Sequence, residues 1–111
     1  MGLNKKFKEL SKKIQDRIWK NKINKGFDTK NVPLEFCYLN EEVSEAFEAW
    51  RKKKEDLGEE LADVAIHLYG VAEKVGIDLG EEIIKKMKKN ENRKYKTVNG
   101  VKLKEEEVSD N

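Results

Sequence analysis

The fold is decided by residues 34–51, LEFCYLNEEVSEAFEAWR, and by residues 59–74, EELADVAIHLYGVAEK. Apolar side chains recur in both stretches at intervals of three and four, the period of an α-helix with one face in a core. Between residues 61 and 72 the second stretch is apolar nearly all round, and Asp63 is its only charged residue. We therefore expect the second stretch to form a buried helix.

Two more helices are expected on either side of this pair. Phe7, Leu10, Ile14 and Ile18 form a helical apolar stripe near the N-terminus, which Gly26 ends. Asp78, three residues before Glu81 in sequence, has the spacing of a capping box that opens the last helix. The expected helices span about 3–24, 33–53, 55–75 and 78–93.

After the last helix the pattern changes to a short extended segment. Asn99-Gly100 is the signal of a two-residue β-hairpin turn, and we expect residues 96–111 to form a hairpin or an extended tail whose end frays. The whole chain, 1–111, is predicted to be a single all-α domain, a four-helix bundle. So many apolar positions in a small bundle also favour a core shared with a second subunit.

Composition excludes several classes of protein. The 111 residues carry 24 basic and 22 acidic side chains, interspersed, which argues against a dedicated nucleic-acid surface. The sequence has no apolar run near 18 residues and no signal-peptide core, so we expect a cytoplasmic protein without a membrane partner. One cysteine excludes an internal disulfide and a multi-cysteine zinc site, and one histidine excludes histidine-rich metal sites. Chemistry here must depend on carboxylates.

Four carboxylates are the candidate metal ligands. Glu42 and Glu45 lie three residues apart on one expected helix, and Glu60 and Asp63 on the next, so each pair projects from one helix surface. A short connection makes these helices antiparallel, which lets the two pairs face each other. Four converging carboxylates repel unless a divalent cation binds, and oxygen ligands select Mg²⁺ or Mn²⁺.

A structural reading of the same residues stays open. Glu42 and Glu45 can form a solvated face, and a lysine can pair with Asp63, because Glu-rich patterns are common in helices rich in lysine and glutamate. The protein would then be a non-catalytic helical oligomerisation or binding module.

Paired motifs resemble the MazG-like nucleotide pyrophosphohydrolases. Residues 41–45, EEVSE, and 59–64, EELADV, resemble the family's EExxE and ExxD signature. The segment 76–79, GIDL, resembles the turn into the family's last helix. The resemblance continues through the closing pattern of Lys86, Asn90, Arg93 and Tyr95.

The resemblance implies an all-α fold that assembles as a homodimer or homotetramer. It also implies Mg²⁺-dependent cleavage of nucleoside triphosphates between the α and β phosphates, in housecleaning or nucleotide-pool control. A specialised substrate such as phosphoribosyl-ATP is the alternative within the family. Carried over by position, the metal-binding and catalytic carboxylates are Glu42, Glu45, Glu60 and Asp63.

Substrate contacts are expected from the last helix. The resemblance assigns Lys86 and Asn90 to the nucleotide or its phosphates, and Arg93 continues the same helical stripe at spacings of four and three. Cations in a last helical turn are also favoured by the helix dipole alone. His67, one turn after Asp63, either contacts the nucleotide or is a core histidine bonded to a backbone carbonyl.

Overall fold

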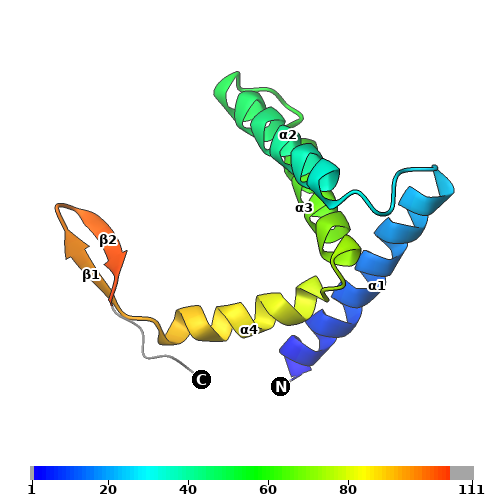
Figure 1. Ribbon diagram of the computed structural model, residues 1–111. Helices are drawn as coiled ribbons and strands as arrows, with labels where there is room; N and C mark the ends of the chain where they lie inside the picture. The colour runs from blue at the N-terminus through cyan, green and yellow to red at the C-terminus, as the bar shows by residue number, and fades with distance from the viewer. Residues whose placement is uncertain (1, 106–111) are drawn as a thin grey trace.

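The computed structural model describes residues 2–105 (Figure 1). Its described part contains four α-helices and one two-stranded sheet, so the expected all-α fold with a short C-terminal hairpin is confirmed. The helices begin and end within two residues of the expected ranges. They are α1 (Gly2–Asn24), α2 (Val32–Arg51), α3 (Leu57–Lys74) and α4 (Leu79–Asn92), followed by β1 (Tyr95–Val98) and β2 (Val101–Lys104).

Local sequence signals account for the helix ends. The Asn31 side chain caps α2 by accepting a hydrogen bond from Leu34 N, and Pro33 occupies the first turn. Asp78 caps α4 by accepting from Glu81 N at 3.2 Å. Gly76 follows α3 at φ +75°, a left-handed conformation that glycine adopts without the Cβ clash of other residues.

The helices α2 and α3 form an antiparallel helical hairpin, here called the α2/α3 hairpin (Figure 1). Its interior is made of small side chains, with Ala46 and Ala49 of α2 and Val71 and Ala72 of α3 all buried. Small residues at a helix contact allow close approach of the two backbones, so carboxylates at the seam are held at short range.

The first helix packs through polar residues. Its buried residues are Ser11, Gln15 and Lys22, whereas Leu10 and Ile14 of the expected apolar stripe are 59% and 49% exposed. The helix is confirmed, but its apolar stripe is not the face by which α1 packs in the single chain. Hydrogen bonds provide the reason: Gln15 Nε2 donates to Ile77 O at 2.8 Å, and Leu79 N donates to Gln15 Oε1 at 3.1 Å.

The helices are splayed, not closed. The radius of gyration is 17.1 Å, whereas a compact chain of this length has about 13 Å. In Figure 1, α4 packs against α1 and leads away from the α2/α3 hairpin. The expectation that α3 is buried all round was wrong for one chain, since Leu61, Ile66 and Leu68 are 55%, 40% and 40% exposed.

The two strands form the predicted turn. Asn99 and Gly100 adopt φ 51° and 78°, both positive as a two-residue type I′ turn requires. The strands are antiparallel, with Val98 opposite Val101 and Tyr95 opposite Lys104.

The expected fraying concerns mainly residues 106–111, which lie outside the described part of the chain. Within that part, none of the helices has the length and apolar character needed to span a bilayer.

Candidate metal centre

Three of the four predicted carboxylates meet at the seam of the α2/α3 hairpin. Glu42 of α2 and Glu60 and Asp63 of α3 each offer one oxygen, and the three oxygens lie within 4.8 Å of one another. All three residues are half-buried. We call this group the carboxylate cluster. It arises because residues three apart on α3 share a face, and the antiparallel packing of α2 sets Glu42 opposite them.

The cluster fits a hard divalent cation. Glu42 Oε2 and Glu60 Oε2 are buried and have no hydrogen-bond partner among the described residues. Buried carboxylate oxygens without partners are costly, and a divalent cation is one partner that would satisfy both. Oxygen ligands alone favour Mg²⁺ or Mn²⁺ over softer metals.

Two carboxyl groups of the cluster have raised pKa values. Burial, followed by the charge of Glu45, raises the pKa of the Glu42 carboxyl above its ordinary value. The pKa of Glu60 is raised by burial and then by the charges of Glu45, Asp56 and Asp63. Both groups therefore resist ionisation in the metal-free protein, as expected where several carboxylates share one site.

Glu45 lies at the edge of the cluster. It is exposed on α2, outside the group of three oxygens, yet close enough for its charge to raise the pKa of both Glu42 and Glu60. The structure thus brings all four predicted carboxylates to one region. Three of them have oxygens close together, and Glu45 lies at the periphery.

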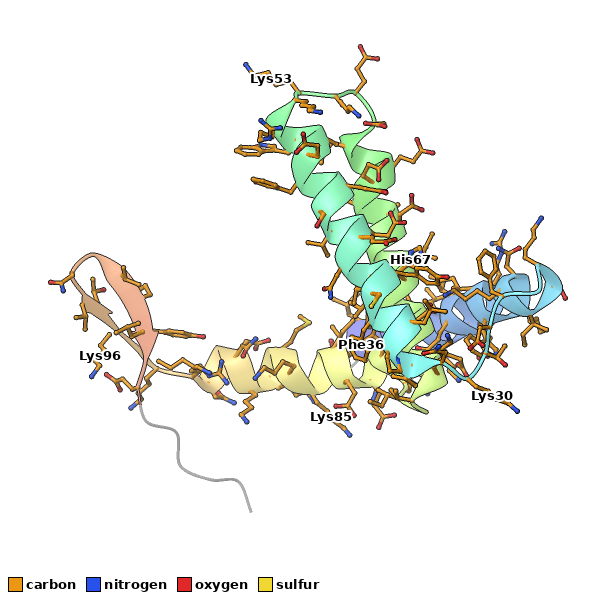
Figure 2. All side chains as sticks on the ribbon, turned by 45° about the horizontal axis from the view of Figure 1, so that its top comes forward. Lys30, Phe36, Lys53, His67, Lys85 and Lys96 are labelled. Atoms are coloured by element: carbon orange, nitrogen blue, oxygen red, sulfur yellow. The ribbon has the colours of Figure 1, made fainter. Side chains whose placement is uncertain are left out.

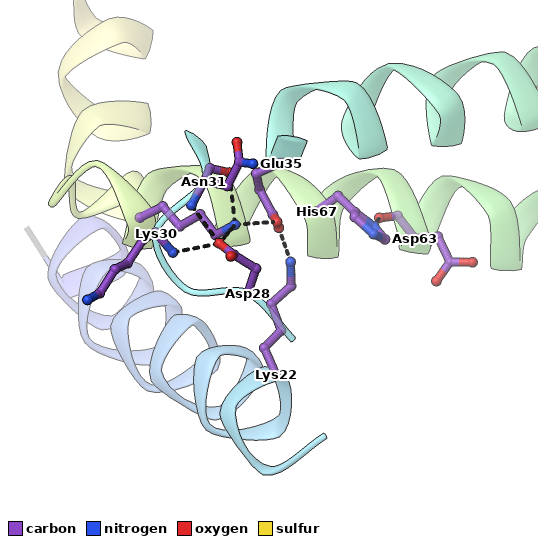
Figure 3. Close-up of polar contacts among 8 residues, drawn as sticks. Lys22, Asp28, Lys30, Asn31, Glu35, Asp63 and His67 are labelled. Atoms are coloured by element: carbon purple, nitrogen blue, oxygen red, sulfur yellow. Dashed lines mark hydrogen bonds and ion pairs between the residues drawn. The ribbon is translucent and has the colours of Figure 1, made fainter. Parts of the chain in front are cut away.

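His67 lies one helical turn after Asp63, a member of the cluster (Figure 3). Its Nδ1 is 2.9 Å from the backbone carbonyl of Asp63, which fits the interpretation of a half-buried histidine bonded to a carbonyl. Because a carbonyl only accepts, Nδ1 carries the hydrogen. Tyr38 packs edge-on against the ring, with centroids 6.4 Å apart. Sequence reasoning missed Tyr38, although it precedes Glu42 by four residues and so shares its helix face.

The predicted substrate contacts lie elsewhere in the single chain. Lys86 and Asn90 are exposed on α4, and Arg93 is half-buried just after that helix. Asp63 is 11 residues from the end of α3, about 17 Å along the helix, and α4 then departs in another direction (Figure 1). Figure 2 shows Lys85 and Lys96 on this departing limb, well away from His67.

A second polar cluster, which the sequence did not reveal, joins three helices (Figure 3). Glu35 of α2 pairs with Lys22 of α1 and Lys74 of α3, and its side chain is 2% exposed. Lys74 Nζ also donates to Asn31 O at 3.1 Å. Burial and then the charge of Lys74 lower the pKa of Lys22. This cluster fixes the start of α2, and with it the register of Glu42 against α3.

The α2/α3 hairpin has two unlike faces. At 100° per residue, Glu41 and Glu45 lie on one side of α2, while Val43 and Phe47 lie on the other. On α3 the same rotation places Glu59 and Asp63 on the side of the hairpin that carries Glu41 and Glu45. We call the side with these four carboxylates the acidic face. The second, the apolar face, carries side chains 40–63% exposed: Phe36, Val43, Phe47, Trp50, Leu61 and Leu68.

This fold and this cluster together define an all-α protein with a carboxylate-lined seam between two antiparallel helices. A model of the MazG-like family matches residues 34–109, which include all but the first two residues of the α2/α3 hairpin, together with α4 and both strands. The chain belongs to the MazG-like family. Comparison with curated proteins and with solved structures finds no match.

Proposed function

We propose that the protein is a Mg²⁺-dependent nucleoside triphosphate pyrophosphohydrolase. The reaction adds water across the anhydride between the α and β phosphates of a ribo- or deoxynucleotide and releases the monophosphate and pyrophosphate. Its cellular role would be housecleaning or control of nucleotide pools. Membership of the MazG-like family supports the class of reaction.

One observation carries the proposal. The Glu42, Glu60 and Asp63 oxygens converge within 4.8 Å from two helices, and two buried oxygens of this group have no partner among the described residues. A merely structural cluster would be expected to pair with lysine, as Glu35 does in the same chain. These three residues would hold the metal.

The side chains have separate roles in this proposal. When bound, the ion offsets the charge of the triphosphate and makes a water molecule more acidic. Glu45, the exposed member of the group, has the solvent access needed to accept the proton that the attacking water loses. Lys86 and Asn90 contact the phosphates. His67 and Tyr38 support the Asp63 turn of α3.

Assembly is part of the proposal. We expect a homodimer or homotetramer, because the apolar face exposes large side chains such as Phe47 and Trp50 in a single chain. Contiguous exposed apolar surface of this kind marks an interaction site in soluble proteins. The stacked pair of Phe47 and Trp50, with centroids 6.0 Å apart, supplies an aromatic anchor.

The test is product analysis with a substrate panel. Purified protein is incubated with each common ribo- and deoxynucleoside triphosphate and with phosphoribosyl-ATP, in Mg²⁺ or in chelator. We expect monophosphate and pyrophosphate from at least one substrate, and only with Mg²⁺. Diphosphate and phosphate as products would contradict the proposed bond. An absence of turnover across the whole panel would favour the binding-module interpretation.

A further inference from the structure

Residues 85–104 project from the rest of the molecule. Every residue from 85 to 104 except Arg93 is exposed, including all residues of β1 and β2. We call residues 85–104 the C-terminal arm. A two-stranded hairpin without further packing is marginally stable in water. An arm of this kind therefore needs a surface that stabilises it.

The hairpin offers an apolar side to such a surface. Directly opposed residues of antiparallel strands point to the same face, and successive residues alternate. The observed register therefore sets Val98, Val101 and Leu103 on one face together with Lys96. These three apolar side chains are 41%, 57% and 44% exposed.

Charge indicates which surface fits the arm. Residues 85–104 contain nine lysine and arginine residues and one acidic residue, Glu91. The helices α2 and α3 have the opposite bias, with nine acidic residues against Arg51 and Lys74. Two such surfaces are complementary. The acidic face also has an apolar contact for the hairpin in Ile66, which is 40% exposed and lies on the same side of α3 as Glu59.

The arm does not cover the acidic face of its own chain. In Figures 1 and 2, α4 and the strands extend away from the α2/α3 hairpin, and α4 packs on α1 instead. The carboxylate cluster and Lys86 are thus held on different limbs of one molecule. A second copy of the chain can bring the two together without any change in the fold.

We propose that the C-terminal arm of one copy lies across the acidic face of a second copy and completes its site. The lysines of the arm then oppose Glu41, Glu45 and Glu59 of the partner copy, and Lys86 and Asn90 face the partner's carboxylate cluster. The roles of Lys86 and Asn90 rest on the proposed function, whereas the docking of the arm does not. Each site is shared between two chains.

Crosslinking tests the docking without reference to activity. In a Cys37→Ser background, one chain carries Val101→Cys in the arm and a second, longer tagged chain carries Ile66→Cys on the acidic face. We expect a short bismaleimide to link the two chains into a heterodimer that a denaturing gel resolves. Lys13→Cys, exposed on α1, replaces Val101→Cys in the control and should give little of this product.

Three results would overturn the docking proposal. One is heterodimer formation no greater than with the Lys13→Cys control. The second is a link within one chain when a dilute chain carries both cysteines, which would mean that the arm folds back on itself. The third is loss of the link on adding a short oligonucleotide that binds the chain, which would assign the arm to nucleic acid instead.

Mixing inactive variants tests the shared site. One chain carries Glu42→Gln with Asp63→Asn, and the other carries Lys86→Ala with Asn90→Ala, so each alone should be inactive. In mixed dimers one of the two sites combines an intact cluster with an intact arm. When equal amounts exchange at random, about half of the dimers are mixed and each has one working site of two. The mixture should therefore recover about a quarter of wild-type hydrolysis. No recovery, with wild type active and the crosslink present, would refute the shared site. An inactive wild type would refute the proposed function and leave the crosslink to decide the docking.

Discussion

At the scale of single residues, the carboxylate cluster makes the metal-free protein less stable than it could be. Glu42 and Glu60 have native pKa values raised by burial and by neighbouring carboxylates. Their native forms bind protons more tightly than the unfolded chain does. The two groups therefore favour folding at low pH, and this contribution is lost as the pH rises through their native pKa values.

Replacing Asp63 by asparagine should separate function from stability. We expect Asp63→Asn to lower Mg²⁺-dependent hydrolysis by more than about 100-fold, because even the supporting partners of metal ligands matter 10- to 100-fold. Its melting temperature without metal should equal or exceed that of wild type, since one repelling charge is removed. Glu9→Gln, an exposed change on α1, is the control. A marked fall in melting temperature would instead mean that Asp63 is structural.

The buried Glu35 makes the opposite prediction. Glu35→Gln leaves Lys22 and Lys74 as two buried cations, so we expect a loss of about 3–5 kcal/mol in the free energy of unfolding. Lys22→Met keeps the pair of Glu35 with Lys74 and removes a lysine whose pKa is already lowered by burial, so its loss should be about 1 kcal/mol. Urea denaturation measures both. Equal losses would contradict the argument that removing Glu35 costs more because it leaves two buried cations unpaired.

At the scale of elements, the contact between α1 and α4 depends on one glycine. A Cβ added at Gly80 would lie 2.5 Å from Ser11 Oγ and 2.6 Å from Ser11 Cβ. Ser11 cannot move freely, because its Oγ is 2.6 Å from the hydroxyl of Tyr69 on α3. This close approach determines how α4 leaves the body of the molecule.

Gly80→Ala should therefore weaken the junction. We expect it to lower the free energy of unfolding by about 1–3 kcal/mol through overpacking. Gly58 of α3 has nothing within 4 Å of an added Cβ, so Gly58→Ala should be neutral or stabilising by up to about 1 kcal/mol. Thermal denaturation of the two variants provides the comparison. A Gly80→Ala variant as stable as wild type would contradict the close packing.

The elements themselves could be predicted from the sequence, because their signals are local. Asn99-Gly100 specifies its own turn, and Asp78 caps α4 through a residue three positions away. The polar contact face of α1 could not be predicted. Gln15 is buried because it bonds Ile77 and Leu79, more than 60 residues further along the chain, and no helical period encodes that match.

The carboxylates of the candidate site could also be predicted from local signals, whereas its other residues could not. Glu42, Glu60 and Asp63 share faces that follow from helical spacing and one short connection, so their convergence could be expected. The position of Lys86 could not, because it depends on the direction in which α4 leaves the Ser11–Gly80 contact. Tyr38 and the pairing of Glu35 likewise depend on contacts between helices.

At the scale of the whole molecule, the open shape and the apolar face predict assembly. Phe47→Lys should convert the oligomer to monomer, because it introduces a charge at the centre of the apolar face, where Phe47 is 59% exposed in one chain. Phe27→Lys is the matched control, since Phe27 is 55% exposed but lies in the loop before α2. Sedimentation equilibrium distinguishes the two. A monomeric wild type, or an unchanged Phe47→Lys oligomer, would contradict this assignment.

The central claim is that Glu42, Glu60 and Asp63 form a metal centre. Titration with Mn²⁺, followed by the electron paramagnetic resonance signal of the free ion, tests it most directly. We expect wild type and Glu9→Gln to bind Mn²⁺ with equal affinity, Mg²⁺ to compete, and Glu60→Gln to weaken binding by at least about 10-fold. Equal Mn²⁺ binding by wild type and Glu60→Gln, or none by either, would contradict the claim.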